Sequence, residues 1–169
     1  PDVYRYAADN GAVISQNSWG YSQMYTAIPQ DVAVAMDYFI ENAGIGPDGE
    51  QTGPMRGGII ICSAGNDYSS RLTFPGADDR VIGVTAMMAN YVKAAYSNYG
   101  TAADIFAPGG SERSDTEFSL DGRVYSTDIT DSYGYKGGTS MACPHVSGIA
   151  ALLISHYGVD KPGFTPDKL

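Results

Sequence analysis

Apolar residues recur every three or four positions in two parts of the chain, the spacing of helices that bury one face. In segment 31–43 this pattern predicts an amphipathic helix with Asp31 as its cap and Gly44 as its stop. The same spacing predicts a helix at the very start, within residues 3–10. Residues 140–157 are predicted to form a long apolar helix, which Gly158 ends. A chain that opens on a helix with no lead-in is expected to be a piece of something longer.

Short apolar runs between these helices predict strands. The run Ile59–Cys62 is apolar throughout and bounded by glycine, which is typical of a strand covered on both faces in a parallel sheet. Further short strands are predicted at 12–16, 81–85, 104–107 and 124–127. Because strands alternate with helices, the chain is predicted to have an α/β fold with a mainly parallel sheet.

Composition narrows the class of protein. The 169 residues suit one domain, and 43% apolar against 17% charged residues favours a packed core over disorder. A net charge of −9 without a cluster of Lys or Arg argues against nucleic-acid binding. No run approaches the ~20 apolar residues that a bilayer crossing needs. Cys62 and Cys143 lie in apolar runs outside any metal-binding spacing, so buried free thiols are predicted.

The segment Gly137–Gly148 joins a sharp turn to the start of a helix. Its first two glycines permit the turn, and Thr139 and Ser140 then open the helix, where unpaired amides and the helix dipole favour an anion. Pro144 has no N–H and is therefore expected to free the Ser140 carbonyl from its usual helical hydrogen bond. For Gly-Gly-Thr-Ser alone, a simple helix cap is the plainer alternative.

The longer string Gly-Thr-Ser-Met-Ala-x-Pro-His-Val, at residues 138–146, resembles the nucleophile motif of the subtilisin family of serine proteases. Cys143 is its one departure, at a position where the family usually has a small residue. Two further segments resemble the family in the right order: Ile61–Asn66, the strand and turn of the oxyanion-hole asparagine, and Val13–Gly20, the strand that lines the substrate cleft. The resemblance extends from about residue 7 to residue 153.

This resemblance implies a role for each matching residue. Ser140 would be the acylating nucleophile, and Asn66 would donate its side-chain amide to the tetrahedral oxyanion together with the Ser140 N–H. The primary specificity pocket would have Ser18, Trp19 and Gly20 on one wall, Ser63, Ala64 and Gly65 on the other, and Thr73 near its floor. No metal ligand and no cofactor is implied for the chemistry.

Three residues near the implied pocket leave alternatives open. Trp19 would either shape a substrate subsite or serve packing, and the sequence favours neither. Asp67, if it lies at the pocket rim, would favour basic substrate side chains, although a solvated carboxylate is the plainer interpretation. Phe74–Pro75 falls where the family often has a cis peptide, so a cis bond is expected.

The family resemblance also carries expectations for the whole protein. Family members often bind structural calcium, for which Asp78, Asp79 and Asp104 would supply carboxylates, with ordinary surface charge as the alternative. Most proteases of this family are exported, which implies an extracytoplasmic location: secreted, periplasmic or at the cell surface.

A serine hydroxyl needs a base, and the family's histidine and aspartate motifs precede the cleft strand in chain order. Both would fall before Pro1. His145, five residues after Ser140 on one helix, lies about 140° around the axis, and we expect it to be a core or hydrogen-bonding residue. His156 is more than four turns along. Lys136, in a glycine turn, is not expected to replace the histidine.

The sequence therefore predicts that residues 1–169 are the C-terminal part of one subtilisin-like catalytic domain, a three-layer α/β fold without its N-terminal strands. The leading hypothesis is a serine endopeptidase acting on protein or peptide substrates, which needs the upstream half of the domain for His and Asp and is inactive alone. The alternatives are a pseudoprotease or peptide-binding module with this fold, and a self-contained α/β binding domain. Strand 12–16 would lie at a sheet edge, which predicts self-association or low solubility.

Overall fold

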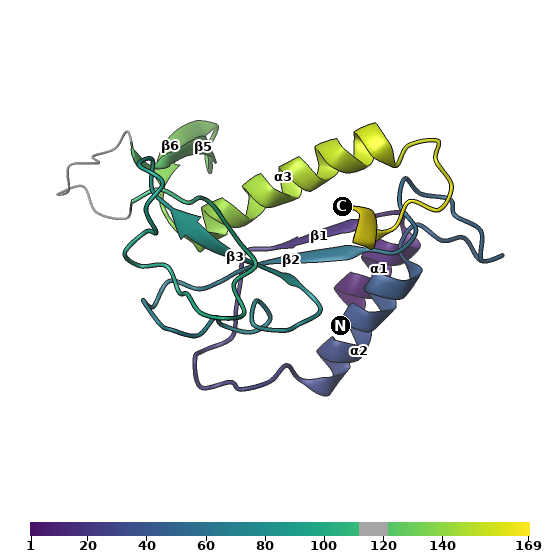
Figure 1. Cartoon of the computed structure of the whole chain (residues 1–169), viewed down its shortest axis with the longest axis horizontal. Coiled ribbons are helices and arrows are strands. Elements are labelled where there is room, and N and C mark those ends of the chain that lie inside the picture. The colour runs from purple at the N-terminus through teal and green to yellow at the C-terminus, as the bar shows by residue number, and fades with distance from the viewer. Residues whose placement is uncertain (112–121) are drawn as a thin grey trace. The chain divides into compact units, whose positions relative to one another are not determined.

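The computed structural model describes residues 1–111 and 122–169 and has an α/β architecture (Figure 1). Four strands form one sheet in the order β1-β2-β3-β4: β1 (Ile14–Asn17), β2 (Ile59–Ser63), β3 (Ile82–Met87) and β4 (Ile105–Pro108). The helices are α1 (Asp2–Asp9), α2 (Gln30–Asn42), α3 (Thr139–Tyr157) and the short 3₁₀ helix η2 (Pro166–Lys168). The predicted fold class, α/β with a mainly parallel sheet, is confirmed.

The chain divides into two compact units. Unit 1 comprises residues 1–16, 27–61 and 147–169, and unit 2 comprises residues 17–26 and 62–146. Of the helices in the described residues, none combines the length and the apolar character that a membrane crossing requires.

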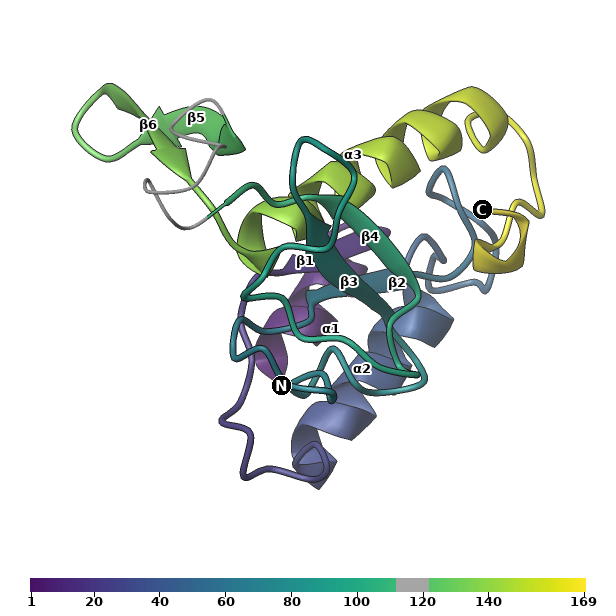
Figure 2. The same cartoon turned by 60° about the vertical axis from the view of Figure 1, so that its left-hand side comes forward.

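In unit 1, helices α1 and α2 lie side by side because each has a buried apolar face (Figures 1 and 2). The rings of Tyr4 and Phe39 meet edge to face with 6.2 Å between their centroids. Both helices were predicted within two residues, but the cap predicted for α2 is wrong. The helix begins one residue earlier, after Pro29, so Asp31 lies inside the first turn, where a carboxylate favours the positive end of the helix dipole.

Strand β2 is buried at all five positions, which confirms the prediction of a strand covered on both faces. In unit 1 the Ile59 N–H donates to the Val13 carbonyl at 3.0 Å. In unit 2 the chain leaves β2 with the Ala64 N–H bonded to the Val84 carbonyl of β3 at 2.9 Å. The hydrogen bond at Ala64 therefore fixes the position at which the loop 64–69 begins.

Strands β3 and β4 of unit 2 are parallel, with Val84 opposite Ile105 and Met87 opposite Pro108 (Figure 2). The Phe74–Pro75 peptide is cis, as expected. Cys62 and Cys143 are fully buried free thiols, as predicted, and burial raises the pKa of the Cys62 thiol well above its usual range.

The predicted strand 124–127 exists, but it belongs to a separate two-stranded sheet. It forms β5 (Val124–Asp128), which pairs antiparallel with β6 (Ser132–Lys136) (Figure 2). The sequence did not predict β6, because Ser-Tyr-Gly-Tyr-Lys contains no aliphatic residue and is interrupted by glycine. Lys136 accordingly ends a strand, opposite Val124, and does not lie in the glycine turn where it was expected.

The segment 44–57 of unit 1 offers a matched pair of glycine substitutions. Gly44 and Gly49 both have positive φ, 70° and 81°, but a Cβ on Gly44 would collide with the Met55 carbonyl oxygen while a Cβ on Gly49 meets nothing within 4 Å. Gly49→Ala is expected to lower the free energy of unfolding by about 1–2 kcal/mol through backbone strain alone. Gly44→Ala should cost about 1–3 kcal/mol more, because the collision adds overpacking. Equilibrium urea unfolding measures both, and equal losses would contradict the collision.

Candidate active site

Helix α3 begins immediately after a turn that the main chain holds in place. The Gly138 N–H donates to the Gly109 carbonyl at 2.9 Å, and a Cβ on Gly109 would approach the Gly138 carbonyl oxygen at 2.8 Å. Thr139, the first helical residue, is fully buried, whereas Ser140 is half-buried. The structure thus places Ser140 at an accessible helix N-terminus, as the motif predicts.

Asn66 joins the loop after β2 to this helix start. Its Oδ1 accepts hydrogen bonds from both the N–H and the hydroxyl of Thr139, each at 2.9 Å, and the Thr139 Oγ1 accepts one from the Gly65 N–H at 3.2 Å. The Thr139 hydroxyl therefore binds the Asn66 loop, which is more than a simple helix cap. Since Oδ1 is occupied by these donors, the amide nitrogen is the polar group that Asn66 can present to a ligand beside Ser140.

A buried asparagine that the sequence analysis did not identify fastens the same loop. The Oδ1 of Asn98 accepts hydrogen bonds from the N–H groups of Asp67 and Ser69 at 2.9 and 3.0 Å, and its Nδ2 donates to the Ala64 carbonyl at 3.0 Å. These contacts satisfy backbone groups on both sides of Asn66. A single asparagine in a Ser-Asn-Tyr-Gly string has no spacing or partner in sequence that would single it out.

Ser140 is also tied to the segment after β1 through its carbonyl. The Ser18 hydroxyl donates to the Ser140 carbonyl oxygen at 2.8 Å, and the Ser140 Oγ lies 3.5 Å from the Ser18 carbonyl oxygen. Pro144 has no N–H for the Ser140 carbonyl, which confirms that this carbonyl is freed from its helical bond. The freed acceptor is used to hold Ser18 against the start of α3.

A hollow of about 500 Å³, here called the Ser18 hollow, lies beside Ser140. Its lining includes six of the seven residues predicted for the substrate pocket: Ser18, Trp19, Gly20, Ser63, Gly65 and Thr73. Ala64 is not in the lining and is fully buried, since neighbouring side chains along an extended chain alternate in direction. The Ala64 carbonyl accepts hydrogen bonds from the Thr73 N–H and hydroxyl at 2.9 and 3.3 Å, so Ala64 positions Thr73 through its main chain.

Trp19 and Asp67 both line the Ser18 hollow, and both are held by neighbours. The Trp19 indole N–H donates to Asn17 Oδ1 at 3.0 Å and its ring meets Tyr21 edge to face at 5.5 Å, while 42% of the residue stays exposed. Trp19 therefore packs against its neighbours and keeps part of its surface exposed in the hollow. The Asp67 carboxylate accepts a hydrogen bond from Gln23 at 3.2 Å, so it is a bonded carboxylate at the rim.

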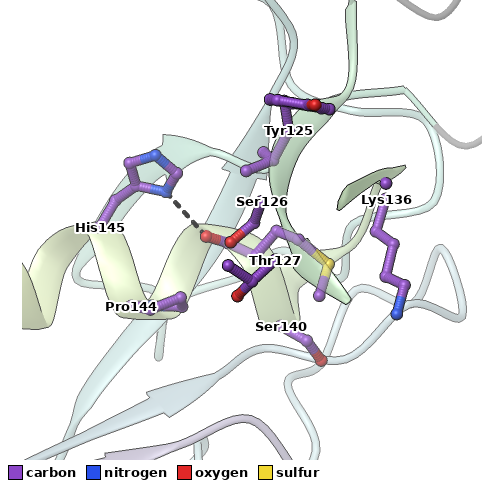
Figure 3. A pocket seen from close by; sticks show the side chains of 10 residues that line it. Tyr125, Ser126, Thr127, Lys136, Ser140, Pro144 and His145 are labelled. Atoms are coloured by element: carbon purple, nitrogen blue, oxygen red, sulfur yellow. Dashed lines mark hydrogen bonds between the residues drawn. The ribbon is translucent and has the colours of Figure 1, made fainter. Parts of the chain in front are cut away.

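Two further hollows adjoin Ser140 on the side of β5 and β6. The hairpin hollow, about 410 Å³, is lined by Val124, Tyr125, Ser126, Thr127, Gly134, Lys136, Ser140, Met141, Pro144 and His145 (Figure 3). The Lys136 hollow, about 570 Å³, is lined by Asn66, Arg123, Tyr135, Lys136, Gly137, Gly138, Ser140 and Met141. Ser140 thus borders three hollows.

Neither histidine of the chain is placed to activate Ser140. The His145 Nδ1 lies 2.8 Å from the Met141 carbonyl oxygen. Figure 3 shows the His145 ring at the opposite end of the hairpin hollow from the Ser140 hydroxyl. Of the two roles expected for His145, core residue or hydrogen-bonding residue, the structure shows the second, since the residue is exposed and its ring bonds the Met141 carbonyl. His156 lies in the last turn of α3, and the Lys136 ammonium pairs with Asp128 at 2.8 Å.

The carboxylates expected to bind calcium have partners within the protein. Asp78 forms an ion pair with Arg80 at 2.7 Å, which holds the pKa of Asp78 below its usual range, and Asp104 accepts the Gly83 N–H at 2.7 Å. In the part of the chain that the structure describes, no three His, Cys, Asp or Glu side chains, Asp79 included, gather as metal ligands would. These residues therefore do not fit a calcium cage by themselves.

Comparison with known proteins agrees with the geometry. A sequence model of the Subtilase family matches residues 2–169. The chain is 33% identical over 154 residues to a thermophilic serine proteinase of Bacillus sp. (strain AK1), covering 91% of this chain and 31% of the relative. It is 39% identical over 114 residues to an extracellular basic protease of Dichelobacter nodosus, covering 67% of this chain and 18% of the relative.

A solved structure described as proteases from Pseudoalteromonas arctica PAMC 21717 superimposes with a TM-score of 0.74 at 32% identity. The superposition covers 99% of this chain and 48% of that chain. The chain thus spans less than half the length of each of these three proteins.

Removal of the Ser18 hydroxyl tests how the site is held together. Ser18→Ala is expected to lower the free energy of unfolding by about 0.5–1.5 kcal/mol, because the Ser140 carbonyl loses its donor and Pro144 provides no replacement. Ser22→Ala is the matched control: the Ser22 hydroxyl makes only a 3.5 Å contact with the Met24 N–H, so a change within about 0.5 kcal/mol is expected. Thermal and urea unfolding of both variants provide the comparison, and indistinguishable values would count against the role of Ser18.

Proposed function

Since the chain belongs to the subtilase family, we propose that the protein is a serine endopeptidase that hydrolyses peptide bonds through an acyl-enzyme on Ser140. The observation that carries the proposal is that Asn66 and Ser140 line the same hollow, while Thr139 holds the Asn66 amide oxygen so that its nitrogen is available. The name of the Bacillus relative, a serine proteinase, supports the same reaction class.

In the proposed mechanism, the Ser140 Oγ attacks the substrate carbonyl carbon and loses its proton to a base. The carbonyl oxygen becomes an oxyanion, which accepts hydrogen bonds from the Asn66 Nδ2–H and from the Ser140 N–H. That N–H has no partner inside the helix, because it belongs to the first turn, and the positive end of the α3 dipole adds to the stabilisation. The amine leaves with a proton from the base, and water then hydrolyses the ester by the reverse steps.

The Ser18 hollow is proposed to bind the acyl part of the substrate. Residues 18–20, Ser63, Gly65 and Thr73 all line this hollow, which supports the predicted arrangement of residues 18–20 on one wall and residues 63–65 on the other. A Cβ on Gly20 would come within 2.6 Å of the Thr73 hydroxyl, so the glycine lets this wall approach Thr73 closely. Ala64 contributes through its carbonyl and not through its side chain.

We infer that the base and the carboxylate that orients it come from outside residues 1–169. Support comes from the two histidines, neither of which lies at the Ser140 hydroxyl. The intact Ser140, Asn66 and Thr139 arrangement favours an active protease over a pseudoprotease, since peptide binding alone would not require the donor beside the serine.

The remaining expectations concern the whole protein. The extracellular naming of the Dichelobacter relative supports an extracytoplasmic location for this protein, acting on protein or peptide substrates. Calcium dependence stays a prediction. Self-association through β1, which stands at the end of the strand order, also stays a prediction.

Asn66→Asp separates the structural role of this side chain from its chemical one. The aspartate keeps an oxygen for the Thr139 donors but replaces the Nδ2 donor with a second oxygen. In the full-length protease kcat is expected to fall about 10²–10³-fold, the loss known for removal of this donor in a subtilisin and carried over from it. Asn66→Ala, which also leaves Thr139 without its acceptor, should lower the unfolding free energy as well. A kcat within tenfold of wild type in Asn66→Asp would argue against the oxyanion role.

Residues 1–169 expressed alone are expected to show no peptide hydrolysis and no stoichiometric labelling of Ser140 by a fluorophosphonate, because no base lies at the serine hydroxyl. Intact-mass spectrometry after labelling makes the measurement, with Ser140→Ala as the blank and the full-length protein as the positive control. Rapid labelling at Ser140 in the isolated segment would show that a base within these residues had been overlooked.

A further inference from the structure

The hollows around Ser140 lie on two sides of the proposed reaction centre. The Ser18 hollow and the Lys136 hollow share only Asn66 and Ser140, so they adjoin this pair from different directions. If the acyl part of the substrate occupies the Ser18 hollow, the chain beyond the scissile bond continues into the Lys136 hollow. Successive residues of an extended peptide are about 3.3 Å apart, so the first two residues after the bond reach it.

The Lys136 hollow is basic in an otherwise acidic chain. The sequence has 10 Lys and Arg residues against 19 Asp and Glu, yet both Lys136 and Arg123 line this hollow. Among the described residues that line it, none is acidic. The Ser18 hollow has the opposite character, because its one charged lining residue in the described chain is Asp67.

Lys136 lines two of the hollows that Ser140 also lines, and its ammonium has N–H donors that can bind a further acceptor. Its Nζ bonds Asp128 Oδ1 at 2.8 Å, and 57% of the lysine side chain is exposed. An ammonium has three N–H donors, so a carboxylate can bind without displacing Asp128, which lines neither hollow. Figure 3 shows the ammonium and the Ser140 hydroxyl at the same end of the hairpin hollow.

The strand that carries Lys136 is stabilised by aromatic packing. Tyr125 of β5 packs on Tyr135 and Tyr133 of β6, with centroid distances of 4.7 and 5.7 Å. Tyr125 and Tyr135 are also direct cross-strand partners. Lys136 therefore extends from the end of a paired strand and not from a loose loop.

From this geometry we propose that Lys136 forms an anion-binding subsite on the leaving-group side, so that the protease prefers an aspartate or glutamate immediately after the scissile bond. The inference rests on the proposed function, because it takes Ser140 as the nucleophile. Lys136 here determines specificity and takes no part in bond making or breaking.

The test compares two internally quenched peptides that differ only by Asp or Asn at the first residue after the scissile bond, with the cut verified by mass spectrometry. For the full-length protein, kcat/KM is expected to be about two- to fivefold higher for the Asp peptide, the size typical of an exposed ion pair. The ratio should fall to about one in Lys136→Gln and below one in Lys136→Glu. Salt at 1 M should also reduce it, since the Debye length is then only about 3 Å.

Lys161→Gln is the matched control, because it removes the same charge from unit 1 at a residue that lines none of the three hollows around Ser140. It is expected to retain the wild-type ratio. The ratio is measured within each variant, so a smaller active fraction does not alter it. A wild-type ratio of one, or an Asp preference that survives Lys136→Gln, would overturn the inference about Lys136. Cleavage of both peptides would at the same time support the proposed endopeptidase function. Failure of the wild type to cleave either peptide would overturn the proposed function and this inference together.

Discussion

The hydrogen bonds between Asn66 and Thr139 are the constraint on which the candidate site depends. They join the loop after β2 to the first residue of α3 across 73 positions of sequence. Thr139 is fully buried, so a rotated Asn66 would leave two buried donors without an acceptor, at a cost of about 1–3 kcal/mol for each. The orientation of the amide is therefore enforced by burial of the threonine, and its nitrogen is left for the oxyanion of the proposed mechanism.

A second connection depends on an irregularity in the helix. Pro144 removes one helical hydrogen bond from α3, and the carbonyl that it frees, that of Ser140, binds the Ser18 hydroxyl. Buried Asn98 adds a third connection by bonding backbone groups on both sides of Asn66. In unit 2 the wall, the loop and the nucleophile are thus joined by bonds between side chain and backbone, which fix positions that strand pairing does not reach. Apart from the bond between the Thr139 hydroxyl and Asn66 Oδ1, each of these bonds uses a main-chain group.

The sequence predicts those parts of the molecule that depend on local periodicity or on an unusually specific motif. The first two helices follow from the spacing of apolar residues, while the buried strand predicted at Ile59–Cys62 and the helix at 140–157 follow from apolar runs. The string at 138–146 singles out Ser140 as the candidate nucleophile. Strand β6 was missed because its residues are polar or aromatic and acquire order only by pairing with β5. Asn98 was missed because its importance lies in contacts that the fold creates. Ala64 was placed in the pocket because a motif specifies positions in sequence but not the direction of each side chain.

The residues proposed to catalyse peptide hydrolysis and those proposed to determine substrate specificity differ in how they are bonded. Asn66, Thr139 and Ser140 are bound to one another or to backbone, so a substitution among them disturbs the others. Lys136 is different: its ammonium bonds Asp128 and its residue is paired with Val124 across the hairpin, so neither contact involves Asn66 or Thr139. Asp67 is intermediate, since its N–H is bound by Asn98 while its carboxylate meets Gln23 at the rim. The charge on the hairpin side can therefore vary without moving the Asn66 amide, whereas the charge of Asp67 at the Ser18 hollow is coupled to the loop that carries it.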